Sequence, residues 1–456
     1  MAYQTVNPAN NQLIKSYPAH SDADVEAALR QADALYHSAW AKGDIAQRLP
    51  VLHKLADLID SRAEELAKIA SQEMGKLIKQ SRGEVKLCAQ IARYYADNAE
   101  RFLAPVKYSS DLGEAWVEHH PIGVLMAVEP WNFPYYQLMR VLAPNLAAGN
   151  PVIAKHASIV PQCAETFAHL VREAGAPEGA WTNLFISQDQ VAKIIADDRV
   201  QGVALTGSEK AGGIVASQAA KHIKKATLEL GGNDVFVVLD DADLERAVKI
   251  GVQARLNNAG QVCTAAKRFI LHEKIAESFL SKFSDAFRQV KIGDPLDEST
   301  TLGPLSSKEA LETLSKQVDE AVKHGAKLHL GGKPVSGEGN FYEPTILTGI
   351  TRENPAYFEE FFGSVAQIYV VKDDDEAIAL ANDSHYGLGG AVFSQDIERA
   401  KRMASGIETG MVYINWLTDT APELPFGGVK RSGFGRELSD LGIKEFVNQK
   451  LVVVRR

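Results

Sequence analysis

The sequence predicts an α/β protein in which two parallel-sheet units follow a helical N-terminal region. Two observations support this prediction: short apolar, β-branched runs alternate with helical patterns from about residue 115, and the alternation starts again after residue 232. Strands that alternate with helices are typical of parallel α/β sheets. The chain has 456 residues, more than one hydrophobic core usually supports, so we expect two or more domains.

The first hundred residues are predicted to be mostly helical. Residues 21–24 resemble a capping box, and Val25, Leu29 and Leu35 follow at helical spacing. Further amphipathic patterns continue to about residue 103.

Two α/β units are expected after this region. In the first, the strands lie in AWVEHHPIGVLMAVEP, PVIAKHAS, QGVALTG and KATLELGGNDVFVVL, and the helices lie in PQCAETFAHLVREAG, QVAKIIADD and GGIVASQAAKHI. In the second, the strands lie in KRFILHE, AKLHLGG, SVAQIYVVKD, GGAVFSQ and GMVYIN. Helices are expected there over residues 274–290, 374–382 and 396–405.

Composition and charge exclude several classes of protein. A hydrophobic content of 45% with 23% charged residues indicates a folded globular chain. The net charge of -9 argues against nucleic acid as a general partner. Three widely spaced cysteines form neither a disulfide framework nor a metal-binding pattern, which predicts a reducing, cytoplasmic location and no metal. We expect neither a signal peptide nor a membrane span, because the required apolar runs are missing from the sequence.

Cys263 stands out among the cysteines because it lies in NNAGQVCTAAKR, between small residues and outside an apolar helix pattern. Such a residue is either a small buried side chain or a nucleophile. A nucleophilic thiol needs a nearby base, cation or helix end, because at a pKa near ~8.5 few thiols are ionised at neutral pH.

Three further segments have both a structural and a chemical interpretation. The segment from Gly207 to Gly212 follows a strand and opens a helix, which suits either an ordinary turn or a phosphate site. Glu229 ends an apolar run, where a carboxylate is either exposed or functional. Asn132 lies between prolines in EPWNFP, where it either forms a turn or presents its amide to an oxyanion.

Six segments, taken together, resemble the aldehyde dehydrogenase superfamily over essentially the whole chain. They are EPWNFP, TGSEKAG, LELGGN, NNAGQVC, EEFFGSV and PFGGVKRSGFGRE, in this order and with these gaps. The sequence looks closest to bacterial succinate-semialdehyde dehydrogenases whose adenosine segment reads KHA. The resemblance implies an aldehyde dehydrogenase-like α/β fold with two Rossmann-like parallel-sheet domains and a small β oligomerisation element. It also implies NAD(P)-dependent oxidation of an aldehyde to a carboxylic acid, most simply of succinate semialdehyde to succinate.

The resemblance assigns roles to the three catalytic candidates. Cys263 matches the nucleophile that forms a thiohemiacetal and then a thioester. Asn132 and the backbone N–H of Cys263 match the oxyanion hole, and Glu229 matches the general base that activates water. This chemistry needs no metal.

The resemblance also implies a bound nicotinamide cofactor. Ser158 stands where NAD-selective relatives often carry a glutamate that would repel a 2′-phosphate, so we expect NADP in preference to NAD. Lys155 and His156 would add attraction for that phosphate. The implied cofactor-binding residues are Trp131, Lys155, Ser158, Gly207, Ser208, Gly212, Glu360 and Phe362.

Substrate recognition is expected to involve Arg140, which matches a position where succinate-semialdehyde enzymes carry arginine. A guanidinium can bind the distal carboxylate of a substrate through bidentate hydrogen bonds. The alternative is that Arg140 is a surface residue or is ion-paired within the protein. Some relatives carry a second arginine where this chain has Asn257, and Arg255 would point elsewhere on a helix. Thr418 and Thr420 are the candidates to supply hydroxyl groups instead.

The resemblance divides the chain into three parts. The coenzyme-binding domain is expected over 1–102 and 122–231, the catalytic domain over 232–444, and the oligomerisation element over 103–121 and 445–456. Exposed strand edges of this last kind favour pairing with another copy, so a homodimer or homotetramer is expected.

Two other interpretations stay open at this point. One is a broad-specificity aldehyde dehydrogenase for medium-chain or aromatic aldehydes. The other is a catalytically retired structural or binding protein, which the intact set of Cys263, Glu229 and Asn132 disfavours.

Overall fold

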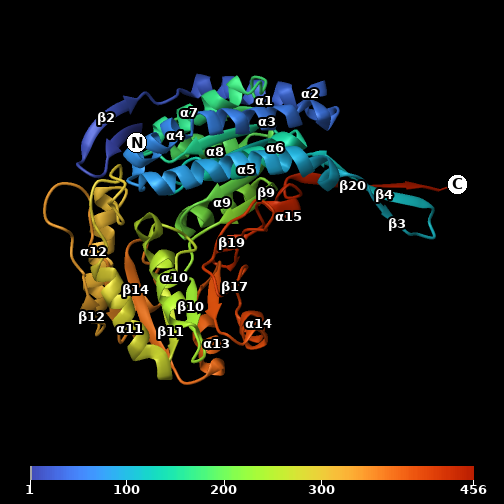
Figure 1. The fold of residues 1–456 in the computed structure, drawn as a ribbon. Coiled ribbons are helices and arrows are strands. Elements are labelled where there is room, and N and C mark those ends of the chain that lie inside the picture. Colours follow the sequence, from blue (N-terminus) through green and yellow to red (C-terminus); the bar gives the residue numbers. More distant parts are fainter. Residues whose placement is uncertain (1–2, 456) are drawn as a thin grey trace.

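The computed structural model describes residues 3–455 as two α/β units and a small sheet that extends from them (Figure 1). Residues 1, 2 and 456, which the predicted domains include, lie outside the described part. The larger sheets are built around separate clusters of buried apolar side chains. The predicted α/β fold with two parallel-sheet domains is therefore confirmed.

The first sheet has six strands within the described residues, and five of them run parallel. Thr206 lies opposite Glu229 in the register of β8 and β9, at the carboxyl edge of the sheet. The strands lie in the runs that the sequence predicts, apart from β7 and the short β19. In spatial order they are β19 (Gly433–Phe434), β9 (Lys225–Glu229), β8 (Val200–Thr206), β5 (Val124–Glu129), β6 (Val152–His156) and β7 (Trp181–Asn183).

Helices cover this first sheet, and the N-terminal ones form the layer at the top of Figure 1. The Ser21 side chain accepts from the Asp24 backbone N–H and the Asp24 carboxylate accepts from that of Ser21, so the predicted capping box is confirmed. The helices are α1 (Asp22–Tyr36), α2 (Ala39–Lys42), α3 (Leu49–Ser61), α4 (Ala63–Met74), α5 (Ile78–Leu103), α6 (Tyr136–Ala148), α7 (Pro161–Glu173), α8 (Gln188–Ala196) and α9 (Glu209–Lys221).

A hairpin that the sequence analysis did not predict precedes these helices. It pairs β1 (Tyr3–Asn7) with β2 (Gln12–Tyr17) in antiparallel fashion. Most side chains of β2 are exposed, so the strand lacks the apolar alternation by which strands are recognised.

The second sheet has seven strands in the described part and is parallel except for its antiparallel edge strand β12. The predicted helix 374–382 coincides with α13, whereas α12 and β13 were not predicted. The strands are, in spatial order, β12 (Lys327–Leu330), β13 (Thr345–Thr348), β14 (Val365–Val371), β11 (Arg268–His272), β10 (Val235–Val238), β16 (Gly390–Phe393) and β17 (Tyr413–Ile414). The helices are α10 (Leu244–Leu256), α11 (Glu273–Arg288), α12 (Lys308–Lys323), α13 (Asp374–Asn382) and α14 (Ile397–Gly406).

The C-terminal part of the chain returns from the second unit to the first. Phe426, Leu438 and Ile443 belong to the apolar cluster of the first unit. The antiparallel pair β15 (Tyr386–Gly387) and β18 (Val429–Lys430) and the short helix α15 (Ser439–Gly442) lie along this path. The return brings residues on either side of position 437 next to the first sheet.

A three-stranded sheet extends away from both units and ends near the C-terminus (Figure 1). It consists of β20 (Val447–Val454), β4 (Glu114–Pro121) and β3 (Val106–Tyr108), with β4 in the centre. Leu451 of β20 and Tyr108 of β3 are among its exposed apolar side chains. The outer edges of β20 and β3 have no paired strand within residues 3–455.

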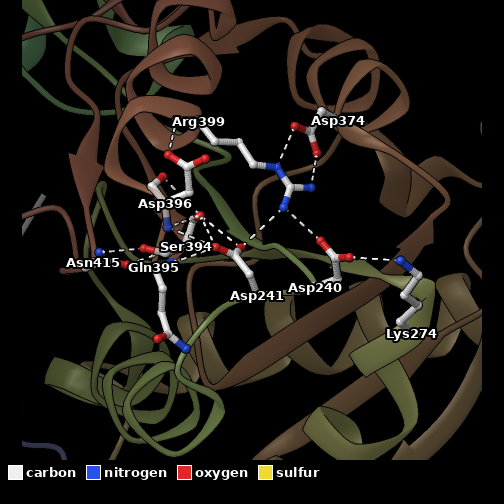
Figure 2. Close-up of polar contacts among 9 residues, drawn as sticks. All are labelled: Asp240, Asp241, Lys274, Asp374, Ser394, Gln395, Asp396, Arg399 and Asn415. Carbon is white, nitrogen blue, oxygen red and sulfur yellow. Dashed lines mark hydrogen bonds and ion pairs between the residues drawn. The ribbon is translucent and has the colours of Figure 1, made fainter.

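A cluster of charges ties together the far end of the second unit (Figure 2). The Arg399 guanidinium forms ion pairs with Asp240, Asp241 and Asp374. Lys274 forms a further ion pair with Asp240. Hydrogen bonding to Arg399 and Lys274 holds the pKa of Asp240 below its ordinary value. The cluster joins the loop after β10 to α13 and α14, and it lies outside the set of residues that surrounds Cys263.

Candidate functional site

Cys263 lies on the loop between a 3-10 turn, Asn257–Gly260, and β11, with a cavity on each side of it. The first cavity has a volume of about 300 Å³ and the second a volume of about 370 Å³. Cys263 and Gln137 line both cavities. Cys263 therefore borders two cavities, each of which offers room for a bound molecule.

The loop before Cys263 has an unusual backbone. Asn258, Ala259 and Gly260 are consecutive residues with positive φ angles of 51°, 54° and 80°. Such conformations are costly for residues other than glycine, and they persist where the surroundings hold them in place. The Asn258 side chain donates to the Asn132 carbonyl at 2.9 Å. A Cβ on Gly260 would lie 2.1 Å from the Gly363 carbonyl oxygen, so glycine is required there.

Asn132 lies just after β5 and is brought to the same first cavity as Cys263. Its Nδ2 donates to the Gln261 carbonyl at 3.1 Å, and its Oδ1 accepts from Gln137 Nε2 at 3.3 Å. An amide nitrogen carries two hydrogens, so one remains for a ligand oxygen. The side chain is buried and oriented from both ends, which favours the interpretation as an oxyanion donor over that of a turn residue.

Glu229 ends β9 and also lines the first cavity. It is 3% exposed, so the alternative of an exposed carboxylate at a strand end is wrong. Neither carboxylate oxygen has a hydrogen-bond partner among residues 3–455. Burial raises the pKa of Glu229 to about 7, while Arg140 opposes this rise. A carboxylate with this pKa is a suitable general base near neutral pH.

Arg140 is buried on α6 and is ion-paired, which the sequence analysis gave as the alternative to binding a substrate carboxylate. Its Nε lies 2.5 Å from Glu437 Oε2, and its Nη2 lies 3.6 Å from Glu229 Oε2. The guanidinium also donates to Gln137 Oε1 at 2.6 Å and to Thr206 Oγ1 at 3.0 Å. Arg140 still lines the second cavity, together with Thr418, Thr420 and Asn257.

The thiol of Cys263 lies among charges of both signs. Burial raises its pKa well above the ordinary value, and Glu229 adds to the rise. Lys267 and Arg140 act in the opposite direction. The two cations are therefore what favours the thiolate at this position.

Five of the predicted cofactor residues line the first cavity. The rings of Trp131 and Phe362 meet edge to face, with centroids 5.8 Å apart, and form an aromatic wall. Ser208 caps α9 by accepting from the Ala211 backbone N–H. The start of a helix favours an anionic group. The five residues are Trp131, Gly207, Ser208, Glu360 and Phe362.

Glu360 approaches the backbone after β9 very closely. Its Oε1 accepts from the Gly232 N–H at 3.1 Å. A Cβ on Gly231 would lie 2.3 Å from Glu360 Oε2, and a Cβ on Gly232 would lie 2.6 Å from the Cys263 carbonyl oxygen. The two glycines of LELGGN thus make room for the carboxylate and for the nucleophile loop.

Three predicted cofactor residues do not line this cavity. Lys155 and Ser158 lie at and after the end of β6, one strand beyond β5. Gly212 instead allows close packing of α9, because a Cβ there would lie 2.6 Å from the Leu230 side chain. The expected attraction of His156 for a phosphate is wrong: the ring is fully buried, with its nitrogens near the backbone carbonyls of Glu129 and Pro134.

Arg255 points away from both cavities, as expected from its place on the helix. Its guanidinium donates to the carbonyl oxygens of Gly260 at 2.7 Å and Ala266 at 3.1 Å. It supports the nucleophile loop from behind and is not a substrate ligand in this arrangement.

The sequence of the chain matches a protein-family model over almost its full length. The model of the aldehyde dehydrogenase family matches residues 1–452. The chain belongs to this family. The predicted NAD(P)-dependent aldehyde dehydrogenase activity is thereby confirmed, and an interpretation as a retired protein has no support from the site.

Named relatives are similar to this aldehyde dehydrogenase along almost their full length. The NADP(+) succinate-semialdehyde dehydrogenase of Deinococcus radiodurans is 47% identical over 99% of this chain and 94% of its own. The NAD(P)+ succinate semialdehyde dehydrogenase Sad of Escherichia coli is 41% identical over 98% and 97%. A crystal structure of succinic semialdehyde dehydrogenase from Streptococcus pyogenes with NADP+ is 48% identical, with a TM-score of 0.98 and full coverage of both chains.

Several site residues of this aldehyde dehydrogenase were missed by sequence reasoning. Gln137, Thr206, Lys267 and Glu437 each contact a predicted site residue. Glu437 is the last residue of the recognised segment PFGGVKRSGFGRE. Its place in this motif indicated a functional residue, but no role was assigned to it. Lys267, four residues after Cys263 in a stretch of small residues, was a comparable signal.

The described residues contain neither a membrane-spanning helix nor a cluster of metal-binding side chains. Within residues 3–455, no helix is both long and apolar enough to cross a membrane. Over the same residues, no group of three or more histidine, cysteine or acidic side chains is arranged to hold a metal ion.

Proposed function

We propose that this aldehyde dehydrogenase oxidises succinate semialdehyde to succinate with NADP, through covalent intermediates on Cys263. The observation that carries the proposal is the meeting of Cys263, Asn132 and Glu229 at one cavity, with a second cavity on the other side of the thiol. The names of the similar enzymes from D. radiodurans and S. pyogenes support the choice of aldehyde and cofactor.

The first chemical step is attack of the Cys263 thiolate on the aldehyde carbon. A C–S bond forms, and the carbonyl electron pair moves onto oxygen. The free hydrogen of the Asn132 amide and the Cys263 backbone N–H stabilise that oxyanion, and one such donor lowers the barrier by about 3–4 kcal/mol. Lys267 and Arg140 favour the thiolate that starts the reaction.

The residues of the first cavity fit a nicotinamide dinucleotide. The start of α9 at Ser208 suits a pyrophosphate, the Glu360 carboxylate suits ribose hydroxyls, and the wall of Trp131 and Phe362 suits a flat ring. When bound there, the cofactor supplies the acceptor for the hydrogen and electron pair that the aldehyde carbon loses.

The second half of the reaction releases the acid from Cys263. Glu229 takes a proton from water, and the resulting hydroxide attacks the thioester carbon. The C–S bond then breaks, which returns the sulfur as a thiolate and frees the carboxylate. The absence of hydrogen-bond partners for Glu229 within residues 3–455 leaves its oxygens free to bind this water.

We expect NADP to be preferred because Ser158 introduces no negative charge near the adenosine ribose. A carboxylate at this position would accept from two ribose hydroxyls but repel a 2′-phosphate. Lys155, three residues before Ser158, is a partly buried residue that would supply a positive charge.

Succinate semialdehyde suits the second cavity because Arg140 lines it. Among the described residues that line this cavity, Arg140 is the one cation, while Glu84 and Asp419 are anionic. One observation favours the alternative of an uncharged medium-chain or aromatic aldehyde: Glu437 already pairs with Arg140. The two proposals differ in whether the Arg140 guanidinium binds the carboxylate of a substrate in addition to that of Glu437.

Cys263→Ala is expected to lower kcat by about 10⁴-fold or more, because the nucleophile is lost.

Glu229→Gln is expected to accumulate an acyl thioester on Cys263, visible by intact mass spectrometry. In the wild type, release of the acid should speed up as pH rises through about 7, the pKa of Glu229, and level off above it. The glutamine variant should lack this dependence. Cys88→Ala, at a buried thiol that lines neither cavity, is the matched control and should keep the activity.

Arg140→Met is expected to raise the KM for succinate semialdehyde about 10- to 100-fold, because a charge-assisted hydrogen bond is worth about 1.5–3 kcal/mol. The kcat/KM for an uncharged aldehyde of the same length reports the loss of the Arg140 charge beside Cys263 and Glu229, and should fall less than that for succinate semialdehyde by this same factor. Glu437→Gln is the matched variant, since it removes the competing carboxylate and should preserve the preference for the acidic substrate. An unchanged KM in Arg140→Met would select the uncharged aldehyde as substrate.

Ser158→Glu is expected to shift the ratio of kcat/KM values towards NAD by about tenfold or more, through repulsion of the 2′-phosphate. Ser158→Ala is the control, because it removes the hydroxyl without adding charge and should keep the preference. A wild type that strongly prefers NAD contradicts this part of the proposal.

The three-stranded sheet is the element through which we expect copies of the chain to associate. The free edges of β20 and β3 and the exposed Leu451 and Tyr108 favour pairing with a second copy. Light scattering on the purified protein should report a homodimer or homotetramer at micromolar concentration. A mass of about one chain would contradict this expectation.

A further inference from the structure

We propose that Lys267 is a positioning residue for the aldehyde dehydrogenase reaction: its buried ammonium joins the nucleophile loop to Glu360, and so holds the thiol and the cofactor-binding carboxylate in one arrangement. The inference rests on the proposed roles of Cys263 and Glu360. It adds to them a residue whose side chain touches both.

The Lys267 ammonium contacts three oxygen atoms. Its Nζ donates to the Val262 carbonyl at 2.9 Å and to the Cys263 carbonyl at 2.5 Å, and it forms an ion pair with Glu360 Oε1 at 3.0 Å. An ammonium has three N–H donors: the two carbonyls accept from two of them, and the third remains for the carboxylate beside it. A neutral amine would leave one acceptor without a donor.

Burial makes this arrangement obligatory. The Lys267 side chain is 0% exposed, and a buried charge is tolerated only when it is paired and hydrogen-bonded. Two of its partners are backbone atoms of the loop that carries the nucleophile. The third partner, Glu360, is anchored separately to the Gly232 N–H. A shift of the loop would therefore break contacts to a buried cation.

The position of Lys267 also favours the reactive form of the thiol. Burial and Glu229 raise the pKa of Cys263, and Lys267 is the first of the two cations that oppose this rise. Lys267 thus acts on the sulfur by charge and on the loop by hydrogen bonds. A residue with a merely structural role would leave the ionisation of the thiol unchanged.

The substitution Lys267→Met tests the proposal through measurements that need no aldehyde. The rate of alkylation of Cys263 by iodoacetamide, followed from pH 6 to 10, gives the pKa of the thiol. We expect this pKa to rise because the charge of Lys267 is lost, so that alkylation at neutral pH slows about tenfold. The dissociation constant of NADP, from quenching of protein fluorescence, should increase several-fold because Glu360 keeps only its hydrogen bond from the Gly232 N–H.

Three variants serve as controls. Cys263→Ala identifies the signal of the nucleophile, because Cys88 and Cys163 are buried. Lys267→Arg keeps the charge and should recover most of the shift in thiol pKa. Lys274→Met removes an exposed lysine that pairs with Asp240 in the remote cluster of Figure 2, and should behave as the wild type in both assays.

Loss of the buried cation alone leaves Glu360 unpaired, which destabilises the fold. The double variant Lys267→Met with Glu360→Gln removes both charges and is compared with Glu360→Gln alone. The proposal is overturned if a folded Lys267 variant keeps the thiol pKa and NADP affinity of its reference. A wild type that fails to oxidise aldehydes overturns the proposed function instead, and leaves the measured coupling of Lys267 to the thiol intact.

Discussion

The buried guanidinium of Arg140 faces more negative charge than it can neutralise. Glu229, Glu437 and Glu129 are all within its electrostatic reach, and burial raises the pKa of each carboxyl. Burial of an unpaired carboxylate is costly, so the protein must share one cation among three acids. Arg140 lies closer to Glu437 than to Glu229, at 2.5 Å against 3.6 Å. This unequal sharing leaves Glu229 a pKa of about 7, whereas a tight pair would make it a weak base.

Three separate parts of the chain meet at the carboxyl edge of the first sheet and place the acidic residues around Arg140. The parallel strands β5, β8 and β9 end together, which places Glu129, Thr206 and Glu229 side by side. The second unit contributes the strained loop that ends at Cys263, and the returning C-terminal segment contributes Glu437. The site therefore depends on the contact between the units more than on either sheet alone.

The sequence predicted the two sheets because their buried strands are short apolar runs separated by amphipathic helices, and α13 was placed at its observed bounds. It did not reveal the hairpin β1–β2 or the two-residue strand β19, since exposed or very short strands carry no apolar period. Motifs located Cys263, Glu229 and Asn132. They could not locate the pairing of Arg140 with Glu437, because nothing local in a sequence records contacts between its distant ends.

The contacts of Arg140 limit how it could bind the substrate carboxylate of the proposed reaction. Its Nη2 is used by Gln137 and Thr206, and its Nε faces Glu437. Nη1 donates to the Tyr136 hydroxyl at 3.2 Å and retains a second hydrogen. A two-pronged pair, which needs two free N–H groups on one edge, is thus unavailable while Glu437 stays in place. Burial raises the pKa of Glu437, and a protonated Glu437 would release the charge of Arg140 to an incoming anion. In the proposed reaction, selectivity for an acidic aldehyde would therefore depend on the Glu437 carboxyl as much as on Arg140.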